Sequence, residues 1–251
     1  MNKMPLVSIV MPTFKARYFE EALLSAMNQT YGEVEIFISD DCPCADIQEI
    51  VERHVENCRM PVRYVRNCIR LGDDNLTQCI VGARGEYVKF LNDDDVLMPD
   101  CVERMMDVFL SDDLISLVTS RRTLIDEEGR VLPDILPTHC PFDDDVVLHP
   151  NDLIGYLADK PMNFIGEPST VLFRRADLLG VQPNIWSLNG VTIRAIGDLA
   201  IYVNVLRSGG HLAYLISPLS CFRLHAEQNQ KDPDLVRGAS RDYFEFTEQI
   251  K

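Results

Sequence analysis

The chain has 251 residues, of which 46% are hydrophobic and 25% charged, a composition typical of a globular protein with a sizeable core. Its formal net charge of −15 argues against DNA or RNA as a partner, because an acidic surface repels the phosphate backbone. No stretch reaches the roughly 18 apolar residues that span a bilayer, and no signal peptide is recognisable. We therefore expect a cytoplasmic protein without a transmembrane segment, with peripheral association at the inner membrane face as the alternative.

The first half of the chain alternates apolar runs with helical patterns. The continuous apolar run 6–11, which ends at Pro12, predicts a strand buried on both faces of a sheet. Further strands are predicted at 35–39, 62–65 and 87–91, and helices at 19–28, 46–55, 75–83 and 99–110. Alternation at this pitch predicts an α/β fold, with a Rossmann-like, mostly parallel twisted sheet flanked by helices.

The second half is less regular. Strands are predicted at 115–123, 170–174 and 212–216, and helices at 151–158 and 198–207. Residues 133–150 carry four prolines and a run of three aspartates, which predicts a long surface loop. The segment 226–251 is polar and is predicted to be a C-terminal tail that is mobile or becomes ordered only with substrate.

Acidic residues follow two of the predicted strands. In parallel sheets, ligands bind beyond the carboxyl ends of the strands, near the switch in strand order. Pro12-Thr13 follows the first strand, Asp40-Asp41 the second, and Asn92–Asp95 the fourth. The same edge of the sheet is therefore predicted to carry two acidic clusters, which is the first indication of function.

The run Asn92–Asp95 has two interpretations. Adjacent carboxylates repel one another, and a cation such as Mg²⁺ or Mn²⁺ would compensate them while also binding substrate phosphates. Alternatively, the run is a solvated turn in which Asp95 or Asp100 caps the next helix. Asp41 is likewise open: its carboxylate accepts a hydrogen bond from a nucleobase or ribose, or it belongs to a polar loop. Asp46 is predicted to be an N-cap.

Several spaced motifs together resemble the family 2 inverting glycosyltransferases of the GT-A fold. The similarity covers roughly residues 5–225 and is most specific over the first hundred. The motifs are VSIVMPTF (7–14), IFISDDCP (36–43), GARGEYVKFLNDDDVLMP (82–99), IGEPSTVLFRR (165–175) and IGDLAIYVNVLRSGG (196–210). The resemblance implies a GT-A domain over 1–225, with a nucleotide-sugar-binding half (1–110) and an acceptor-binding half (111–225).

The resemblance also implies roles for residues of the first half. Asp41 would bind the nucleobase, and Pro12 and Thr13 would line the nucleotide pocket. The metal motif is the segment LNDDDVL (91–97), which aligns with the family pattern L-D-x-D-D-x-L.

In that alignment Asn92 takes the first acidic position. Asp94 then becomes the primary metal ligand, with Asp95 supporting it. Asp93 forms the literal DxD spacing with Asp95 and is kept as a nucleotide-binding candidate.

The catalytic base of the family is commonly the aspartate of a Glu-Asp pair, which reads Gly197-Asp198 here. Asp198 is therefore the candidate base, although the glutamate is missing. An N-cap worth about 1 kcal/mol is the alternative role for Asp198. Glu167 is the other acceptor-side carboxylate and the substitute candidate for the base.

Two further residues carry open assignments. The segment Phe222–His225 resembles the family's Y-R-x-H segment, so His225 would complete the metal shell or touch the diphosphate. The alternative for His225 is an exposed histidine of the tail. Trp186 is expected either to stack on an acceptor sugar or to anchor the core.

The implied activity is metal-dependent transfer, with Mn²⁺ or Mg²⁺, of a sugar from a nucleoside-diphosphate sugar with inversion at the anomeric carbon. UDP is the expected nucleotide, with dTDP as the alternative; the acceptor would be a carbohydrate, a lipid-linked glycan or a glycoprotein. A sugar-1-phosphate nucleotidyltransferase would carry a glycine-rich loop after the first strand, and MPTFKARYF (11–19) has no glycine. A non-catalytic nucleotide- or carbohydrate-binding module is the third possibility, favoured by Gly197. The oligomeric state is left open.

Overall fold

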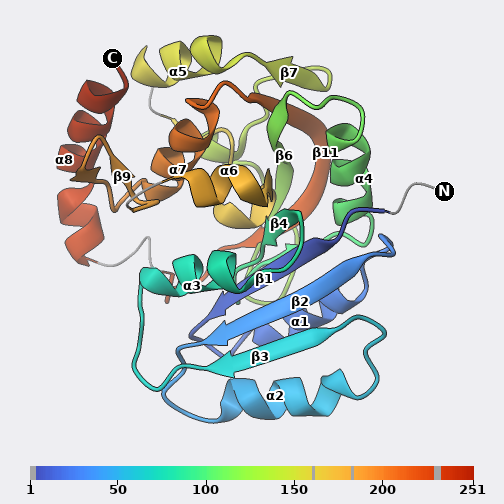
Figure 1. Ribbon diagram of the computed structural model, residues 1–251. Coiled ribbons are helices and arrows are strands. Elements are labelled where there is room, and N and C mark those ends of the chain that lie inside the picture. The colour runs from blue at the N-terminus through green and yellow to red at the C-terminus, as the bar shows by residue number, and fades with distance from the viewer. Residues whose placement is uncertain (1–3, 160–161, 182–183, 229–232) are drawn as a thin grey trace.

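The computed structural model describes residues 4–159, 162–181, 184–228 and 233–251. The first half alternates strands and helices as predicted (Figure 1). Its strands are β1 (Val7–Thr13), β2 (Val34–Asp40), β3 (Val62–Arg66), β4 (Tyr87–Phe90) and the short β5 (Val96–Leu97). Its helices are α1 (Phe19–Met27), α2 (Asp46–Val55), α3 (Asp74–Gly82) and α4 (Cys101–Phe109). β2 is buried at every position, because helices cover both faces of the sheet.

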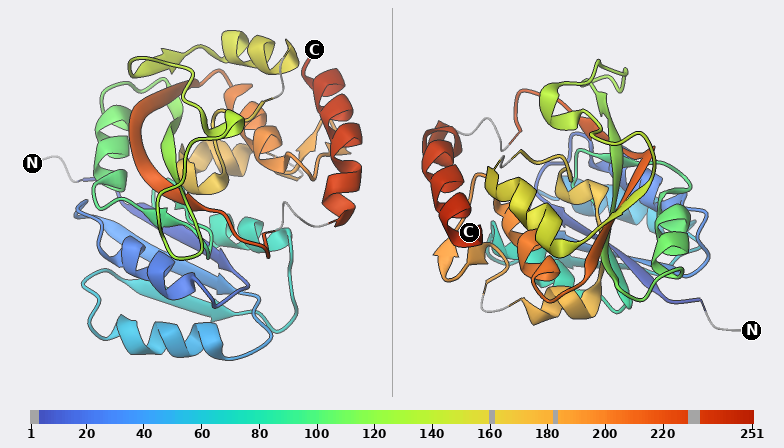
Figure 2. Two further views of the ribbon diagram at one scale, coloured as in Figure 1. Left: turned by 180° about the vertical axis from the view of Figure 1, so that it is seen from behind. Right: turned by 90° about the horizontal axis from the view of Figure 1, so that it is seen from above.

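The second half is built around two long strands. The strands are β6 (Ile115–Ile125), β7 (Val146–Leu148), β8 (Leu172–Arg174), β9 (Ser187–Leu188), β10 (Val191–Thr192) and β11 (His211–Arg223). The helices are α5 (Pro150–Asp159), α6 (Arg175–Gly180), α7 (Gly197–Leu206) and α8 (Pro233–Ile250), with 3₁₀ turns η1 (Leu136–Thr138) and η2 (Pro168–Thr170). β11 is far longer than predicted and curves alongside β6 (Figure 2). The two strands pair in parallel, with a register shift between Leu215 and Ser220.

The main sheet has the order β3-β2-β1-β4-β8-β6-β11-β5, and β7 pairs with β11. β3, β2, β1 and β4 run parallel, whereas β8 is antiparallel to both β4 and β6. The arrowheads of β1, β2 and β3 therefore point to one edge (Figure 1). The chain moves from β1 outward to β2 and β3 and then returns to the other side of β1 with β4. This switch in strand order is where parallel α/β sheets bind ligands.

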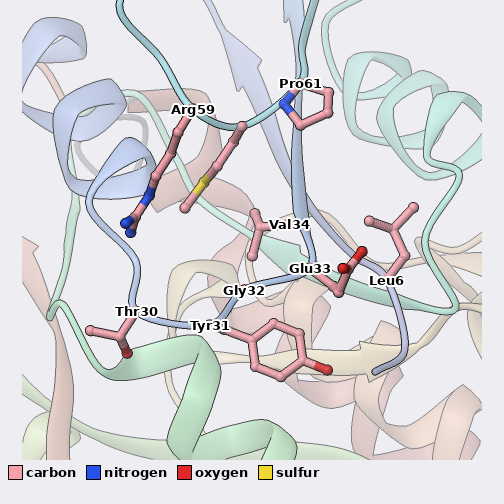
Figure 3. A pocket seen from close by; sticks show the side chains of 9 residues that line it. Leu6, Thr30, Tyr31, Gly32, Glu33, Val34, Arg59 and Pro61 are labelled. Carbon is pink, nitrogen blue, oxygen red and sulfur yellow. The ribbon is translucent and has the colours of Figure 1, made fainter. Parts of the chain in front are cut away.

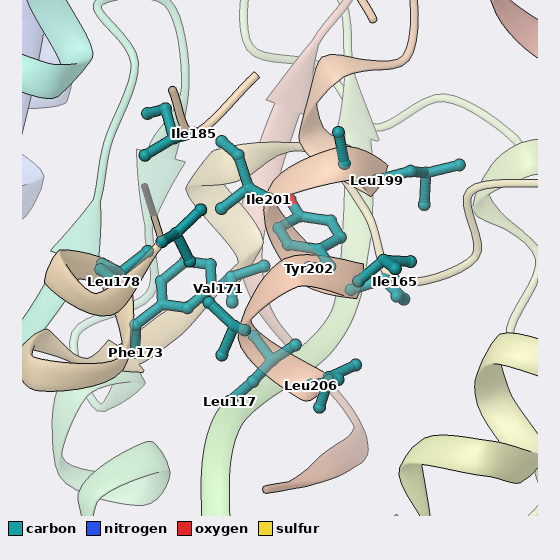
Figure 4. Packing of buried hydrophobic residues seen from close by; sticks show 14 of the residues in the cluster. Leu117, Ile165, Val171, Phe173, Leu178, Ile185, Leu199, Ile201, Tyr202 and Leu206 are labelled. Atoms are coloured by element: carbon teal, nitrogen blue, oxygen red, sulfur yellow. The ribbon is translucent and has the colours of Figure 1, made fainter. Parts of the chain in front are cut away.

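Two apolar clusters cover the two faces of the sheet. One joins the sheet to α1, α2 and α4, and the other to α3, α5, α6, α7 and α8. α7 is buried almost all round: Tyr202 and Leu206 pack with Leu117 of β6 and Phe173 of β8 (Figure 4). A helix enclosed in this way cannot shift without repacking the core, so its first turn is a rigid support.

Three local predictions need correction. The segment predicted as a polar tail contains α8. Apolar residues recur in α8 at helical spacing, and its Phe246 and Ile250 are buried in the apolar cluster around α7, called the α7 cluster below. Asp46 is the first residue of α2 and not its cap; the N-cap is Ala45. Within the loop predicted at 133–150, β7 joins the sheet by pairing with β11. No helix in the described part of the chain is long and apolar enough to cross a membrane.

Candidate active site

The switch point between β1 and β4 is bridged by the Asp93 carboxylate. Its Oδ2 accepts hydrogen bonds from the backbone N–H groups of Phe14 and Lys15, both at 2.7 Å. Burial raises the pKa of Asp93 to about 6, and the charge of Asp94 acts in the same direction. Asp93 therefore ties the loop after β1 to the loop after β4, and its predicted nucleotide contact would fall to Oδ1.

Asp94 meets the end of β11. Its Oδ2 lies 3.0 Å from Nε2 of His225, whose Nδ1 accepts the N–H of Glu227 at 3.2 Å. In a neutral imidazole this leaves the proton on Nε2, directed at Asp94. The Asp94 side chain is 20% exposed and the His225 side chain 1%. The two predicted metal ligands are thus in contact although 131 positions separate them, and His225 is not an exposed tail residue.

The pair fits a cation that binds together with a diphosphate. Among the residues that the structure describes, no three His, Cys, Asp or Glu side chains are placed to hold a metal ion. Mg²⁺-type sites in nucleotide enzymes, however, use one or two carboxylates and complete their coordination with substrate phosphates and water. The Asp94 carboxylate suits such a shared site for Mn²⁺ or Mg²⁺, and Nε2 of His225 would join it once the imidazole proton has moved to Nδ1 and the Glu227 contact is given up.

Asp95 is buried behind this pair. It is 1% exposed, and its oxygens accept hydrogen bonds from the Arg223 N–H at 3.2 Å and from Asn92 Nδ2 at 3.3 Å. Burial raises the pKa of Asp95 well above its usual value, and the charge of Asp94 adds to the effect. Direct ligation of a metal by Asp95 would require breaking these contacts, and its supporting role stays a prediction.

Arg223 stabilises the acidic turn, the segment Asn92–Asp95 that follows β4. It is 1% exposed, donates from Nε to the carbonyl of Asp94 at 3.0 Å and forms an ion pair with Glu21 at 2.5 Å. Its guanidinium also lies 4.6 Å from the ring centroid of Tyr18. The sequence analysis quoted Arg223 within a family-like segment but assigned it no role, and that segment was the available signal.

A buried lysine supports the same turn. Lys89 of β4 is fully buried, and its Nζ donates to the carbonyls of Phe90 (3.0 Å) and Ser169. Burial lowers the pKa of Lys89 to about 8. Ser169 also accepts the N–H of Asn92 through its hydroxyl at 3.0 Å. These hydrogen bonds connect η2 to the end of β4, which carries the predicted metal motif.

A cleft of about 600 Å³ opens beside Asp41 at the carboxyl ends of β1, β2 and β3. Its walls include the Phe14 ring, with the Arg70 guanidinium 4.0 Å from the ring centroid. The Asp41 carboxylate is 7% exposed and accepts the N–H groups of Leu71 and Gly72 at about 3 Å and the Asn67 amide at 2.8 Å. Asp41 therefore anchors the loop that closes the cleft, and a nucleobase contact would be additional.

The two other predicted nucleotide residues lie at the end of β1. Thr13 is fully buried; its hydroxyl donates to the Ser39 carbonyl at 3.3 Å, and its own carbonyl accepts the Asp41 N–H at 2.9 Å. In this structure Thr13 therefore positions Asp41 and does not itself line the cleft. Pro12 is half-buried in β1 opposite Ser39.

Asp198 is the second residue of α7. Its Oδ1 accepts the Leu199 N–H at 2.9 Å, and its Oδ2 accepts a hydrogen bond from Asn163 Nδ2 at 2.5 Å. The N-cap of α7 is Ile196, so the alternative role of Asp198 as a cap is wrong. Burial raises the pKa of Asp198 to about 7, with the charge of Glu167 acting in the same direction. A carboxylate with a pKa near neutrality can accept a proton at physiological pH.

Glu167 links the acidic turn with Asp198. Its carboxylate meets Arg122 of β6 in a fork, at 2.7 Å to Nε and 3.4 Å to Nη2. The Arg122 side chain is 1% exposed and that of Glu167 14%. The charge of Glu167 contributes to the raised pKa of both Asp95 and Asp198, so the two sites lie within its electrostatic reach. Glu167 is committed to this ion pair, which disfavours it as the substitute base.

Trp186 and α8 complete the surroundings of α7. Trp186 is partly buried against the α7 cluster, and its Nε1 donates to the Asp73 carbonyl at 3.2 Å. Asp242 of α8 accepts the N–H groups of Arg194 and Ala195 at 2.8 and 2.7 Å, immediately before α7. The sequence analysis missed this clamp, since it treated the segment as a tail.

A second hollow, of about 260 Å³, lies at the opposite ends of the strands (Figure 3). It is lined by residues that precede β1, β2 and β3, including Leu6, Tyr31 and Pro61. None of the predicted site residues reaches it. The cleft at Asp41 is therefore the candidate nucleotide site.

Residues 8–178 match the profile of the family described as "Glycosyl transferase family 2". The chain belongs to this family. A chondroitin synthase of Escherichia coli is 31% identical over 133 residues, which are 53% of this chain and 19% of the relative, so the chain spans about a fifth of that protein.

Solved structures of the same fold agree with this assignment. S. aureus TarS residues 1–349 in complex with UDP superposes with a TM-score of 0.63 at 16% identity, covering 98% of this chain and 64% of the other. The mannosyltransferase PcManGT from Pyrobaculum calidifontis, in complex with GDP-Man and Mn²⁺, gives a TM-score of 0.63 at 16% identity over 90% of this chain and 59% of the other. The expected GT-A fold is thus confirmed, with its mostly parallel central sheet flanked by helices.

Proposed function

We propose that this family 2 glycosyltransferase moves a sugar from a UDP-sugar to a hydroxyl group of a glycan, lipid-linked glycan or glycoprotein, with inversion and with help from Mn²⁺ or Mg²⁺. The observation that carries the proposal is the contact of Asp94 with His225 at the switch in strand order. The pair is connected to the cleft at Asp41 through the preceding residue, Asp93, which accepts the N–H of the cleft residue Phe14. A nucleotide in that cleft would extend its phosphates toward the pair.

The donor half would recognise the nucleotide through the cleft. The imide edge of uracil would meet the Asp41 carboxylate, while Phe14 and Arg70 offer a flat surface to the base. UDP is favoured by the TarS complex, which binds UDP on the same fold. dTDP presents the same imide edge and is the alternative donor nucleotide.

A divalent cation held by Asp94 and His225 would supply charge neutralisation on the departing diphosphate. The chain's own contribution is to fix the two ligands. Arg223 holds the carbonyl of Asp94, whereas His225 would exchange its Glu227 N–H contact for a proton on Nδ1 when Nε2 binds the cation. The PcManGT complex contains Mn²⁺ on the same fold, which supports this assignment.

Asp198 would take the proton from the acceptor hydroxyl as its oxygen attacks the anomeric carbon. The bond from that carbon to the diphosphate oxygen breaks as the new C–O bond forms, so the configuration inverts. A base of this kind contributes on the order of 10²–10⁴-fold to the rate. Its half-buried position on the rigid first turn of α7 fixes the direction of attack.

The proposal is tested with UDP-sugars and acceptor hydroxyls in the presence of Mn²⁺. We expect metal-dependent release of UDP, and NMR of the product should show the anomeric configuration opposite to that of the donor. Release of pyrophosphate from UTP and a sugar 1-phosphate would instead identify a nucleotidyltransferase. UDP binding with no turnover on any donor would indicate a non-catalytic module.

A further inference from the structure

The Asn163 amide is fixed in one orientation against Asp198. Its Oδ1 accepts the Gly166 N–H at 3.0 Å, so its Nδ2 is the atom that faces the Asp198 carboxylate. Nδ2 also donates to the Gly166 carbonyl at 3.1 Å. The assignment of oxygen and nitrogen therefore follows from a backbone donor, which leaves no freedom for a flipped amide.

The loop that carries Asn163 is itself rigid. Gly166 has φ of 108°, and a Cβ there would lie 2.6 Å from Thr170 Oγ1. Tyr202 of α7 donates to the Gly166 carbonyl at 2.9 Å. Arg122 approaches the Asn163 and Phe164 carbonyls at 3.5 Å. Asn163 is thus held by β6 on one side and by α7 on the other.

The balance of charges around Asp198 depends on such donors. Burial and the charge of Glu167 favour the neutral carboxyl, whereas N–H donors and Arg122 favour the carboxylate. Leu199 donates to Oδ1 and Asn163 to Oδ2. The titratable and charged groups that face Asp198 come from the loop before η2, from β6, from α7 and from α8: Glu167, Arg122, Tyr202 and Tyr243.

We propose that Asn163 is a positioning residue, which holds the Asp198 carboxylate ionised and in one orientation for proton transfer. The proposal rests on the function proposed above, in which Asp198 is the base. Asn163 touches neither the donor nor the acceptor in this scheme. Its effect passes through one hydrogen bond to Oδ2, while Oδ1 accepts the Leu199 N–H, so one lone pair on each oxygen stays available to the acceptor hydroxyl.

The test measures the pH dependence of kcat/KM for Asn163→Ala. Loss of a hydrogen bond to a charged group should move the acidic limb upward by about one to two pH units, with the UDP dissociation constant unchanged. Asn163→Asp has nearly the same shape but sets a second carboxylate against Asp198, and the repulsion between the two should move the limb upward at least as far. Asn204→Ala is the control, since Asn204 donates to the Ser187 carbonyl at 2.7 Å from the same helix α7 without touching Asp198.

Carbon-13 NMR of the aspartate carboxyl groups supplies a readout that does not need turnover. The resonance absent in Asp198→Asn identifies Asp198, and its titration should shift upward in both Asn163 variants. An unshifted titration in folded Asn163→Ala and Asn163→Asp would overturn the positioning role. If Asp198→Asn itself turns over normally, the proposed function is wrong about its base, and the NMR titration alone then decides on Asn163.

Discussion

The indole ring of Trp186 lies directly against the α-carbon of Gly197. A Cβ on Gly197 would stand 2.7 Å from Cε3 and 3.2 Å from Cζ3 of that ring. The family pattern that the sequence resembles has a glutamate before the aspartate, where this chain has Gly197. The Trp186 ring occupies the space that a side chain at 197 would need.

The contact predicts a cost for any side chain at 197. Gly197→Ala should lower the free energy of unfolding by about 1–3 kcal/mol, because the Trp186 ring must shift to admit the new Cβ. Gly155→Ala in α5 is the matched control, since a Cβ there meets nothing within 4 Å; helix propensity then makes it neutral or stabilising. Urea unfolding of both variants measures the difference. Equal stability of the two would show that Trp186 yields without strain.

Asp94 is predicted to act only through the metal-dependent part of UDP binding. Mn²⁺ should increase the UDP affinity of wild type by some factor, and in Asp94→Asn that factor should be at least about tenfold smaller, because the substitution weakens a proposed ligand. Calorimetry with and without Mn²⁺ measures this. Asp107→Asn, at an exposed position of α4, serves as control. Unchanged metal-dependent affinity would remove Asp94 from the metal shell.

Asp41 is predicted to act on the nucleoside and not on the metal. Asp41→Ala should weaken UDP binding by about 1–3 kcal/mol, the usual loss for a hydrogen bond to a charged group. The loss should be the same with and without Mn²⁺. Because Asp41 also anchors the Leu71–Gly72 segment, hydrogen exchange of those amides should become faster. A loss that appears only with Mn²⁺ contradicts the assignment.

The Asp198 carboxyl is predicted to be needed for activity and to lower the stability of the fold. Asp198→Asn should lower kcat at least about 10²-fold, and wild-type kcat/KM should rise with pH toward a plateau above about 7, where the carboxyl is ionised. Measured with a competent acceptor, near-wild-type turnover in Asp198→Asn would reject this base.

The effect on stability has the opposite sign. The folded pKa of about 7 exceeds the ordinary 3.8, so the folded state binds the proton more tightly and loses stability as pH rises from about 4 to 7. Asp198→Asn is free of this loss. Its melting temperature should therefore rise relative to that of wild type between pH 4 and pH 8. The corresponding difference in the free energy of unfolding has an upper bound of about 4 kcal/mol. A melting difference that is constant across this range would show that the Asp198 carboxyl is not perturbed.

Asp242 of α8 is predicted to stabilise the start of α7, because it binds the two N–H groups just before that helix. Asp242→Ala leaves the N–H groups of Arg194 and Ala195 without their acceptor, which should cost about 1–3 kcal/mol of stability. kcat should fall while UDP affinity stays unchanged, because Asp41 and Asp94 are remote in the fold. Parallel melting and UDP titration check both statements. A fall in UDP affinity would show that α8 acts on the donor side as well.

The local pattern of the sequence determined most of the first half. Apolar runs and helical spacing depend only on neighbouring residues, so β1 to β4 and the helices between them lie where the periodicity predicted. The parallel order followed from the alternation, and with it the edge that carries Asp41 and Asp94. The acidic run after β4 was visible in the same way, whereas its role as a metal motif and the role of Asp198 came only from the family resemblance.

Only the tertiary structure decided what those residues touch. His225 reaches Asp94 because the end of β11 pairs with β5, the short strand that directly follows the Asp94 turn, and no spacing along the chain encodes that contact. Asp95 is buried, although its neighbour Asp94 is partly exposed, because Arg223 closes over one side of the turn. The raised pKa of Asp198 likewise arises from burial between α7 and distant loops. Such environments are sums over residues far apart in sequence, so they exist only once the chain has folded.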